Sequence, residues 1–401
     1  MTSEWHEVPL RELVGYISKG IAPSYAEEAS ETTIRVLNQK CNRNFRISYG
    51  DSRLHDTLKK KVPPERYVKP DDILINSTGA GTAGRIAQIE DVPSATTIDG
   101  HMILIRSNGK VTQKFLGYAL KAHQWEVLQL DEGSTGQTEL NRDRLLDEIM
   151  INYPVSFDEQ NAIVGTLESI DRKLIVNKEI NDNLEQQAQS YFQELFVDNA
   201  DPEWTTGTIS DLGNVVGGST PSKAKPEYYT ESGIAWITPK DLSINKSKFV
   251  SHGENDITEL GLKNSSAAIM PEGTVLFSSR APIGYIAIAA GEVTTNQGFK
   301  SVVPKPEIGT PFVYFFLKNT LPVIEGMASG STFKEVSGST MKNVPAVIPD
   351  AETLAKFSDF CAPIFAQQRI LEEQNQSLAT LRDNLLPKLM SGEIDVSAVQ
   401  L

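Results

Sequence analysis

The chain contains the same sequence pattern twice, and this duplication limits its possible folds more than any other feature. A Glu-Trp pair opens each half, at Glu4-Trp5 and again at Glu203-Trp204. The run Gly84-Arg85-Ile86-Ala87 likewise returns as Gly284-Tyr285-Ile286-Ala287. The copies are offset by about 200 residues, whereas the units of a solenoid have roughly 20–50 residues. The sequence therefore predicts two copies of one globular module, an arrangement that suits a target with two half-sites.

Each copy is predicted to be a mixed domain followed by a long helix. Short apolar runs such as Ile73-Leu74-Ile75 alternate with Gly, Asp, Asn and Pro, which is typical of strands between turns. Helices are expected at 115–130 and 311–320, and the glycine-containing stretch 215–229 is expected to be a loop. The predicted segments are a first domain at 1–155, a first spacer helix at 156–200, a second domain at 201–349, and a second spacer helix with the C-terminal tail at 350–401.

The long helices, expected at 156–199 and 351–390, are predicted from apolar residues spaced alternately three and four positions apart. Asn181 and Asn375 occupy equivalent places in the two spacings. A buried asparagine in such a seam fixes the register of two helices at a cost in stability. Either the helices pack on each other with both asparagines near the contact, or both asparagines face solvent. The predicted fold class is therefore α+β, with two mixed α/β domains separated by two long, antiparallel coiled-coil helices.

The formal net charge of −14 argues against a nucleic-acid partner until its distribution is considered. Residues 40–69 carry nine basic and three acidic side chains. Such a local basic patch is typical of a surface that meets phosphate, although a solvated loop has the same composition. Much of the acidic excess lies in the helical segments, with nine acidic against three basic residues in 156–200 and eight against four in 350–401.

The sequence carries few signs of catalysis, secretion or membrane insertion. Its apolar runs are shorter than the ~18–20 residues of a membrane span, and its start lacks the pattern of a signal peptide. Cys41 and Cys361 lie in different halves, and the five histidines lack metal-ligand spacing. A glycine loop for nucleotide phosphate is missing. We therefore expect a cytoplasmic chain with no catalytic, cofactor-binding or metal residues of its own, although an enzyme with an unrecognised site stays an alternative.

Several motifs occur in the order found in one known family. They include Gly-Gly-Ser-Thr-Pro-Ser at 217–222, Trp-Ile-Thr-Pro-Lys-Asp-Leu at 236–242 and Thr-Asn-Gln-Gly-Phe at 295–299. The run Asp-Ile-Leu-Ile-Asn-Ser-Thr-Gly at 72–79 and the run Leu-Leu-Pro-Lys-Leu-Met-Ser-Gly-Glu at 385–393 fit the same pattern. With the duplication, these motifs make the chain resemble the DNA-specificity (S) subunit of a type I restriction–modification system.

The resemblance implies a non-catalytic subunit with two target-recognition domains, each reading one half of a bipartite site in double-stranded DNA. It also implies that the helices act as a spacer and as the docking surface for two modification (methyltransferase) subunits. S-adenosylmethionine, ATP and Mg are expected on partner subunits, which include restriction (translocase/nuclease) subunits. The start of the second helix, 347–353, lacks the Glu-Gln pair found at 159–160. Partner docking is therefore predicted to be less symmetric than the repeat.

Candidate DNA contacts follow from the chemistry of the bases and the backbone. Arginine and lysine can reach guanine or phosphate, and asparagine and glutamine can reach adenine. In the first domain the candidates are Asn38, Gln39, Lys40, Asn42, Arg43, Arg46, Lys59, Lys60 and Lys61. In the second domain they are Thr220, Ser222, Lys223, Lys225, Lys240, Lys246, Lys248 and Arg280.

Each candidate has a structural alternative. Asn38 and Asn42 could form local turns, and Arg280 could brace a loop. At the level of the whole chain, the alternative function is a coiled-coil interaction scaffold with two ligand- or protein-binding lobes. Salt-dependent DNA binding separates the two functions, because a protein that displaces counterions from phosphate binds more weakly as salt rises.

Overall fold

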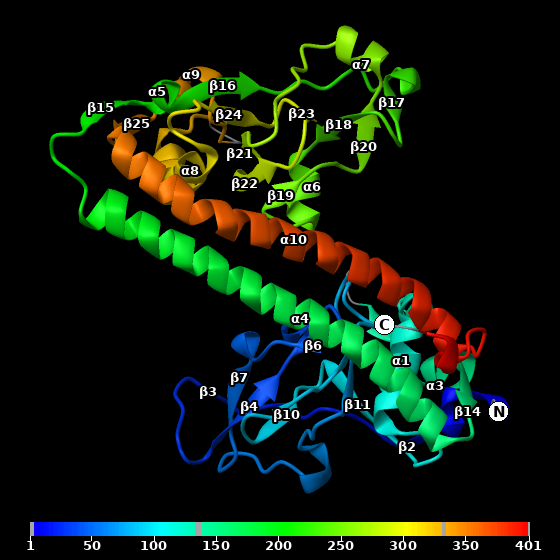
Figure 1. The fold of residues 1–401 in the computed structure, drawn as a ribbon. Helices are drawn as coiled ribbons and strands as arrows, with labels where there is room; N and C mark the ends of the chain where they lie inside the picture. Colours follow the sequence, from blue (N-terminus) through cyan, green and yellow to red (C-terminus); the bar gives the residue numbers. More distant parts are fainter. Residues whose placement is uncertain (1–3, 133–137, 331–333, 400–401) are drawn as a thin grey trace. The chain divides into compact units, whose positions relative to one another are not determined.

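The computed structural model describes residues 4–132, 138–330 and 334–399 (Figure 1). The chain divides into two compact units: unit 1 is residues 1–173 with 378–401, and unit 2 is residues 174–377. Each unit contains one mixed domain and a part of each long helix, α4 (Phe157–Gln193) and α10 (Ala351–Met390). Among the described residues, no helix is long and apolar enough to cross a membrane. The predicted α+β class, with two long helices, is confirmed.

Unit 1 contains two four-stranded sheets. The first sheet is antiparallel and has the strand order β2 (Val14–Lys19), β11 (Met102–Ser107), β8 (Ile73–Asn76) and β9 (Ile86–Gln88). The second sheet has the order β10 (Thr96–Ile98), β4 (Thr33–Leu37), β7 (Arg53–Asp56) and β3 (Tyr25–Ala26), and its β10–β4 pair is parallel. The two-stranded ladders are β1 (Trp5–Pro9) with β14 (Met150–Pro154), β5 (Asn42–Arg43) with β6 (Arg46–Ile47), and β12 (Asp131–Glu132) with β13 (Glu139–Leu140).

The helices of the first domain are α1 (Gln113–Ala122), α2 (Gln124–Val127) and α3 (Arg142–Glu148). The single helix expected at 115–130 is therefore two helices, which is a correction. Helix α1 begins where the Thr112 hydroxyl accepts a hydrogen bond from the Phe115 amide (3.2 Å). The chain then bends at His123, whose φ and ψ are −91° and 14°. The bend allows the Gln124 side chain to bind the main chain of Ile86 (2.9 Å) and Gly84 (2.8 Å), and these bonds anchor α2 beside β9.

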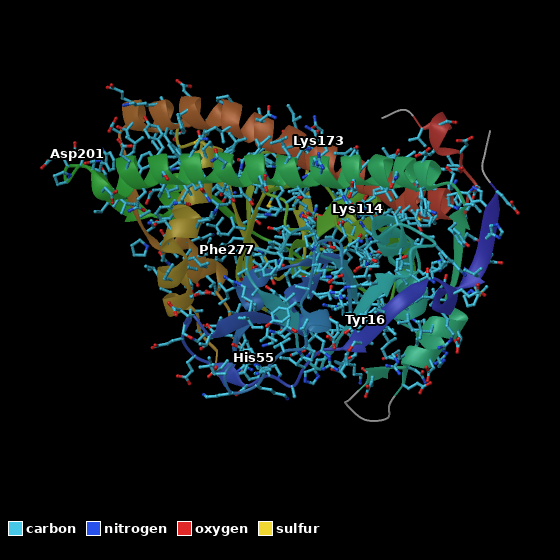
Figure 2. The ribbon with its side chains drawn as sticks, turned by 90° about the horizontal axis from the view of Figure 1, so that it is seen from below. Tyr16, His55, Lys114, Lys173, Asp201 and Phe277 are labelled. Atoms are coloured by element: carbon cyan, nitrogen blue, oxygen red, sulfur yellow. The ribbon has the colours of Figure 1, made fainter. Side chains whose placement is uncertain are left out.

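The main core of unit 1 joins the first domain to its parts of the long helices. Phe115 on α1, Leu167 on α4 and Leu389 on α10 are fully buried in this one core. Lys114, labelled in Figure 2, also binds Glu168 on α4 (2.7 Å). Burial of large apolar side chains stabilises by roughly 1.5–3 kcal/mol each, so this core holds the domain firmly on the helices.

Unit 2 has the sheet order of unit 1 with one additional strand, β19 (Phe249–Val250), which pairs in parallel at the edge of the larger sheet. Its larger sheet has the order β16 (Gly213–Gly217), β24 (Lys300–Pro304), β21 (Val275–Ser279), β22 (Ile283–Ala289) and β19 (Phe249–Val250). Its smaller sheet has the order β17 (Tyr229–Thr230), β20 (Asn255–Ile257), β18 (Ile234–Ile237) and β23 (Thr294–Thr295), and the β18–β23 pair is parallel like β10–β4 in unit 1. A ladder of β15 (Thr205–Thr208) with β25 (Pro345–Ile348) corresponds to β1–β14.

The helices of the second domain are α5 (Ile209–Leu212), α6 (Pro239–Ile244), α7 (Glu259–Lys263), α8 (Thr310–Met327) and α9 (Gly338–Lys342). Helix α8 includes the expected helix at 311–320 and extends beyond it. Strand β16 overlaps the start of the stretch 215–229 that was expected to be a loop, and β17 begins at its last residue, so that expectation was wrong at both ends. Phe277 on β21, labelled in Figure 2, is fully buried with Phe312 and Phe357 in a core that includes α8, α4 and α10.

Within unit 2 the long helices pack against each other in antiparallel fashion. Asn177 donates to the Asn375 side chain (3.0 Å), and four residues later Asn181 donates to Glu372 (3.2 Å). The residue numbers on α10 fall as those on α4 rise, which defines the antiparallel direction. Both asparagines chosen from the sequence thus face the opposite helix, although the partner of Asn375 is Asn177 and not Asn181.

The two tryptophans of the repeated Glu-Trp pairs bind the starts of the long helices. In unit 1 the Trp5 indole donates to Glu159 on α4 (3.2 Å), and in unit 2 the Trp204 indole donates to Asp350 just before α10 (2.9 Å). The buried Gln160 also accepts from the Thr112 amide (2.8 Å). In the second copy, Asp350 therefore accepts the tryptophan hydrogen bond that Glu159 accepts in the first copy.

Candidate nucleic-acid interface

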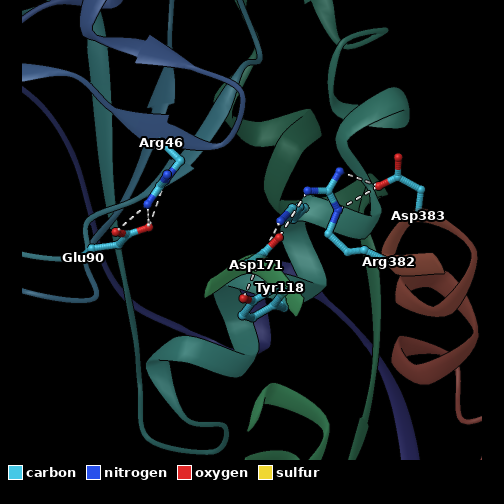
Figure 3. Close-up of polar contacts among 7 residues, drawn as sticks. Arg46, Glu90, Tyr118, Asp171, Arg382 and Asp383 are labelled. Atoms are coloured by element: carbon cyan, nitrogen blue, oxygen red, sulfur yellow. Dashed lines mark hydrogen bonds and ion pairs between the residues drawn. The ribbon is translucent and has the colours of Figure 1, made fainter. Parts of the chain in front are cut away.

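The basic stretch of unit 1 is organised around the β5–β6 hairpin. The tip residues Asn44 and Phe45 both have positive φ (53° and 61°), which turns the chain sharply between the two strands. Lys40, Arg43 and Arg46 are all exposed around this hairpin. Arg46 makes a two-point ion pair with Glu90 (2.8 and 2.9 Å, Figure 3). An exposed pair of this kind contributes little to stability, so the guanidinium can exchange Glu90 for a phosphate at small cost.

Two of the predicted base-contacting residues, Asn38 and Asn42, form hydrogen bonds within the protein. Asn42 is fully buried, and its amide donates to the main chain of Arg85 (2.7 Å) and to Asn76 (3.2 Å). Asn38 accepts from the Lys40 amide (2.8 Å) and donates to the Asp51 carbonyl (2.8 Å). The local-turn alternative therefore describes Asn38, whereas Asn42 is buried and bonded to residues distant in the sequence, and we leave both out of the proposed contact set.

The lysine triplet lies in the turn after β7. Lys59, Lys60 and Lys61 are exposed, and Lys60 donates to the Ala22 carbonyl (2.8 Å). Gln39 is half-buried, and the Thr78 hydroxyl donates to it (3.4 Å). The lysines of the triplet, like the cations of the hairpin, are thus exposed in unit 1.

A polar recess of about 200 Å³ adjoins the hairpin. Its lining includes Arg43, Arg46, Tyr49, Glu90 and Asp91. The Tyr49 hydroxyl donates to the Asp91 carbonyl (2.7 Å), and burial raises the pKa of this phenol. The lining combines two cations with two carboxylates and a phenol, which suits a polar group.

In unit 2 the motif at 217–222 forms a loop that is tied down by aromatic side chains. The Trp236 indole donates to the Ser219 carbonyl (3.0 Å), and the Tyr229 hydroxyl donates to the Pro221 carbonyl (2.6 Å). Thr220 is half-buried and its hydroxyl donates to the Gln297 side chain. The exposed residues that follow on this loop are Ser222, Lys223 and Lys225. Trp236 and Tyr229 therefore fix the base of a loop whose outer part is polar and cationic.

A second cationic segment of unit 2 runs from α6 to β19. Lys240 on α6 and Lys246 after it are exposed; Lys240 pairs with Glu254 (2.5 Å), and the Lys246 ammonium lies 4.5 Å from the centre of the Tyr285 ring. Lys248 differs, because it is only 6% exposed and pairs with Glu185 on α4 (2.7 Å). We therefore replace its predicted DNA contact by a role inside the protein.

Arg280 stays partly exposed and near an acid. Its guanidinium lies 3.6 Å from Glu335, which also faces Lys300 at 3.8 Å. This geometry supports the bracing alternative. The ion pairs of Lys121 and Lys248 were not identified in the sequence, because their carboxylate partners lie far away along the chain.

The fold thus consists of two units with related sheets, and each unit exposes cations on its loops. Comparison with known proteins agrees: the chain belongs to the family described as the type I restriction modification DNA specificity domain, whose model matches residues 2–186 and 202–381.

The chain is similar to curated proteins of the same class. It is 39% identical over 194 residues to the type I restriction enzyme MjaIX specificity subunit of Methanocaldococcus jannaschii, a match that covers 46% of this chain and 45% of that protein. It is 27% identical over 194 residues to the HindI specificity subunit of Haemophilus influenzae, covering 48% of this chain and 42% of that protein. Each match thus spans less than half of the relative's length.

A solved structure shares the fold over nearly the whole chain. The S subunit of a type I restriction-modification system from M. genitalium superposes with a TM-score of 0.62. The superposition covers 97% of this chain and 96% of that chain at 18% identity. At this identity the likeness concerns the fold alone.

Proposed function

We propose that this chain is the DNA-specificity subunit of a type I restriction–modification enzyme. Each unit reads one half of a bipartite site in double-stranded DNA, and the long helices connect the two readers. The chain works in the cytoplasm as a non-catalytic subunit that directs its partners to the site.

The observation that carries this proposal is the repetition of one sheet topology with exposed cations on the loops of both copies. In unit 1 these cations surround the β5–β6 hairpin and the turn after β7, and in unit 2 they follow Pro221 and α6. Lysine and arginine on such loops can neutralise phosphates and position the protein, while a subset reaches base edges. The proposed contact set is Lys40, Arg43, Arg46, Lys59, Lys60 and Lys61 in unit 1, and Ser222, Lys223, Lys225, Lys240 and Lys246 in unit 2.

The partners follow from what the family does. Two modification subunits dock on the acidic long helices and supply methyl transfer with S-adenosylmethionine, and restriction subunits supply ATP- and Mg-dependent translocation and cleavage. The acidic excess of 156–200 and 350–401 supports this division, because a strongly acidic surface repels phosphate and suits a protein partner.

The salt dependence of DNA binding tests the proposal. The assembled complex with its modification subunits is titrated into duplex DNA between about 50 and 200 mM salt, a range over which six to ten phosphate contacts lose roughly 10³–10⁵ in affinity. A steep linear loss in a double-logarithmic plot is expected. Binding that is absent, or that does not change with salt, would instead favour the interaction scaffold.

A further inference from the structure

One segment of unit 2 carries both an exposed lysine and a buried one. Lys246 is exposed above Tyr285, and two residues later the Lys248 side chain turns inward. The Lys248 ammonium donates to Glu185 on α4 (2.7 Å) and to Gln368 on α10 (2.8 Å). The segment that presents Lys246 is therefore attached to both long helices.

An aromatic surface completes the environment of this ammonium. The Phe365 ring centre lies 3.5 Å away, and the ring centres of Tyr314 and Phe315 lie at 4.5 and 5.1 Å. A cation over ring faces is attracted by their negative quadrupoles, and the attraction grows when water is excluded. Three aromatic rings, Glu185 and Gln368 surround the ammonium, so the position of the Lys248 side chain is well defined.

The main chain of the same segment is held by a second helix carboxylate. Glu372 on α10 accepts from the amides of Lys248 (2.8 Å) and Phe249 (3.0 Å). On the opposite edge of the segment, the Ile288 amide of β22 donates to the Lys248 carbonyl (2.7 Å). Glu372 thus binds the amides of Lys248 and of the first residue of β19, and it fixes the start of this edge strand to the helix.

Unit 1 contains a corresponding anchor. The Lys121 ammonium on α1 donates to Asp171 on α4 (3.0 Å), and Asp171 also accepts from Tyr118 and from Arg382 on α10 (Figure 3). The same ammonium lies 5.0 Å from the ring centre of Phe45, the tip residue of the β5–β6 hairpin. Here too a lysine, in this case a half-buried one, links the long helices to a segment that carries exposed cations.

We propose that Lys248 and Lys121 are positioning residues, each holding the cation-bearing segment of its own unit against the long helices. A base-reading side chain needs placement within about 0.5 Å to discriminate, and an anchored segment keeps that placement. Each lysine therefore controls the fidelity of one half-site and leaves the other unchanged. This inference rests on the proposed function for its DNA consequence, whereas the anchoring itself is a property of the chain alone.

The anchoring is measured by hydrogen exchange on the full chain in complex with its modification subunits. In Lys248→Met, amides at 245–250 should exchange about tenfold faster or more, a loosening of about 1.4 kcal/mol, while those of β5 and β6 stay unchanged. In Lys121→Met, the matched control, the hairpin amides at 42–47 should respond and 245–250 should not. Unchanged exchange at 245–250 in Lys248→Met would overturn the inference.

A second variant guards against loss of folding. Glu372→Gln leaves the Lys248–Glu185 pair intact and weakens the bonds that Glu372 accepts from the Lys248 and Phe249 amides and from the Asn181 side chain. Faster exchange confined to this segment supports the anchor. Exchange identical to that of the unmodified chain contradicts it.

The DNA consequence is measured by mapping modified adenines with the same variants. Lys248→Met should lower discrimination at one half-site about tenfold, and Lys121→Met should do so at the other half-site. If both variants relax both halves equally, the lysines are general stabilisers and the inference fails. If the unmodified complex marks no split site at all, the proposed function fails, and the exchange result still decides the anchors.

Discussion

The two units share one sheet topology but connect equivalent lysines to different places on the long helices. Lys121 on α1 and Lys318 on α8 both follow a buried leucine near the same point of a matching helix. Lys121 pairs with Asp171 on the helix that follows its domain, whereas Lys318 pairs with Glu185 on the helix that precedes its domain. Each core is thus formed by many apolar side chains, whereas each of these ion pairs depends on one acid.

The consequence of this rearrangement is an unequal burial of charge. Glu185 serves both Lys248 and Lys318, and the Lys248 side chain is 5% exposed. Asp171 serves Lys121 and Arg382, whose side chains are 11% and 21% exposed. A lysine that is cut off from water depends more on its acid, so unit 2 should be the more sensitive of the two.

Removal of the acid should give the largest effect. Glu185→Leu leaves the Lys248 ammonium buried without its carboxylate, which should cost unit 2 about 3 kcal/mol of unfolding free energy. Asp171→Leu should cost unit 1 less, because water reaches Arg382 more readily. Hydrogen exchange during urea titration resolves the two units. Equal losses, or a larger loss for Asp171→Leu, would contradict the comparison.

The pH dependence of unit 2 should carry the signature of Glu185. Burial alone would raise the pKa of this carboxyl, but the attraction of Lys248 and Lys318 outweighs burial and lowers the pKa to about 2. The folded carboxylate binds a proton less readily than the unfolded one, so its stabilisation is complete above the ordinary value of 4.5 and is lost as pH falls toward 2. We expect about 2 kcal/mol to be lost between pH 6 and pH 3. Glu185→Gln should lack this component, and an identical pH slope in both proteins would exclude it.

The asparagine pair of unit 2 should give a smaller effect of opposite sign. Asn177→Leu with Asn375→Leu replaces a polar pair, of which Asn177 is fully buried and Asn375 half-buried, by apolar side chains and should stabilise the helix contact by about 1 kcal/mol while weakening its register. The exposed Asn183→Leu is the matched control and should change stability little. Thermal unfolding and the oligomeric state are the readouts. A double variant that neither gains stability nor changes assembly would exclude a register role.

Removal of a single phosphate contact should have the smallest effect. One such variant in each unit allows a direct comparison of the two units. Lys61→Ala in unit 1 and Lys223→Ala in unit 2 should each lower the salt slope of DNA binding by about one, uniformly across sequences. Lys263→Ala, an exposed lysine of α7 outside the proposed contacts, should leave the slope unchanged. A change confined to one unit would mean that only that unit meets DNA.

The sequence predicted what depends on periodic burial and missed what depends on distant partners. The helix expected at 351–390 matches α10, because its apolar spacing is local information. Strand β16 was missed since its pairing with β24 is formed across more than eighty residues. Lys246 and Lys248 have similar sequence surroundings. Only Lys248 is buried, and it pairs there with Glu185, which is distant along the chain. Asn42 was likewise predicted to contact a base, but its amide donates to the Arg85 carbonyl.

The most direct test of two half-site readers is a map of modified bases. The chain is expressed with its modification subunit, and host DNA is sequenced for methylated adenines. Our account predicts one split motif with a fixed spacer, in which exchange of residues 201–349 for those of a relative changes one half and preserves the other. A continuous motif, or no motif from a verified complex with an active partner, would contradict it.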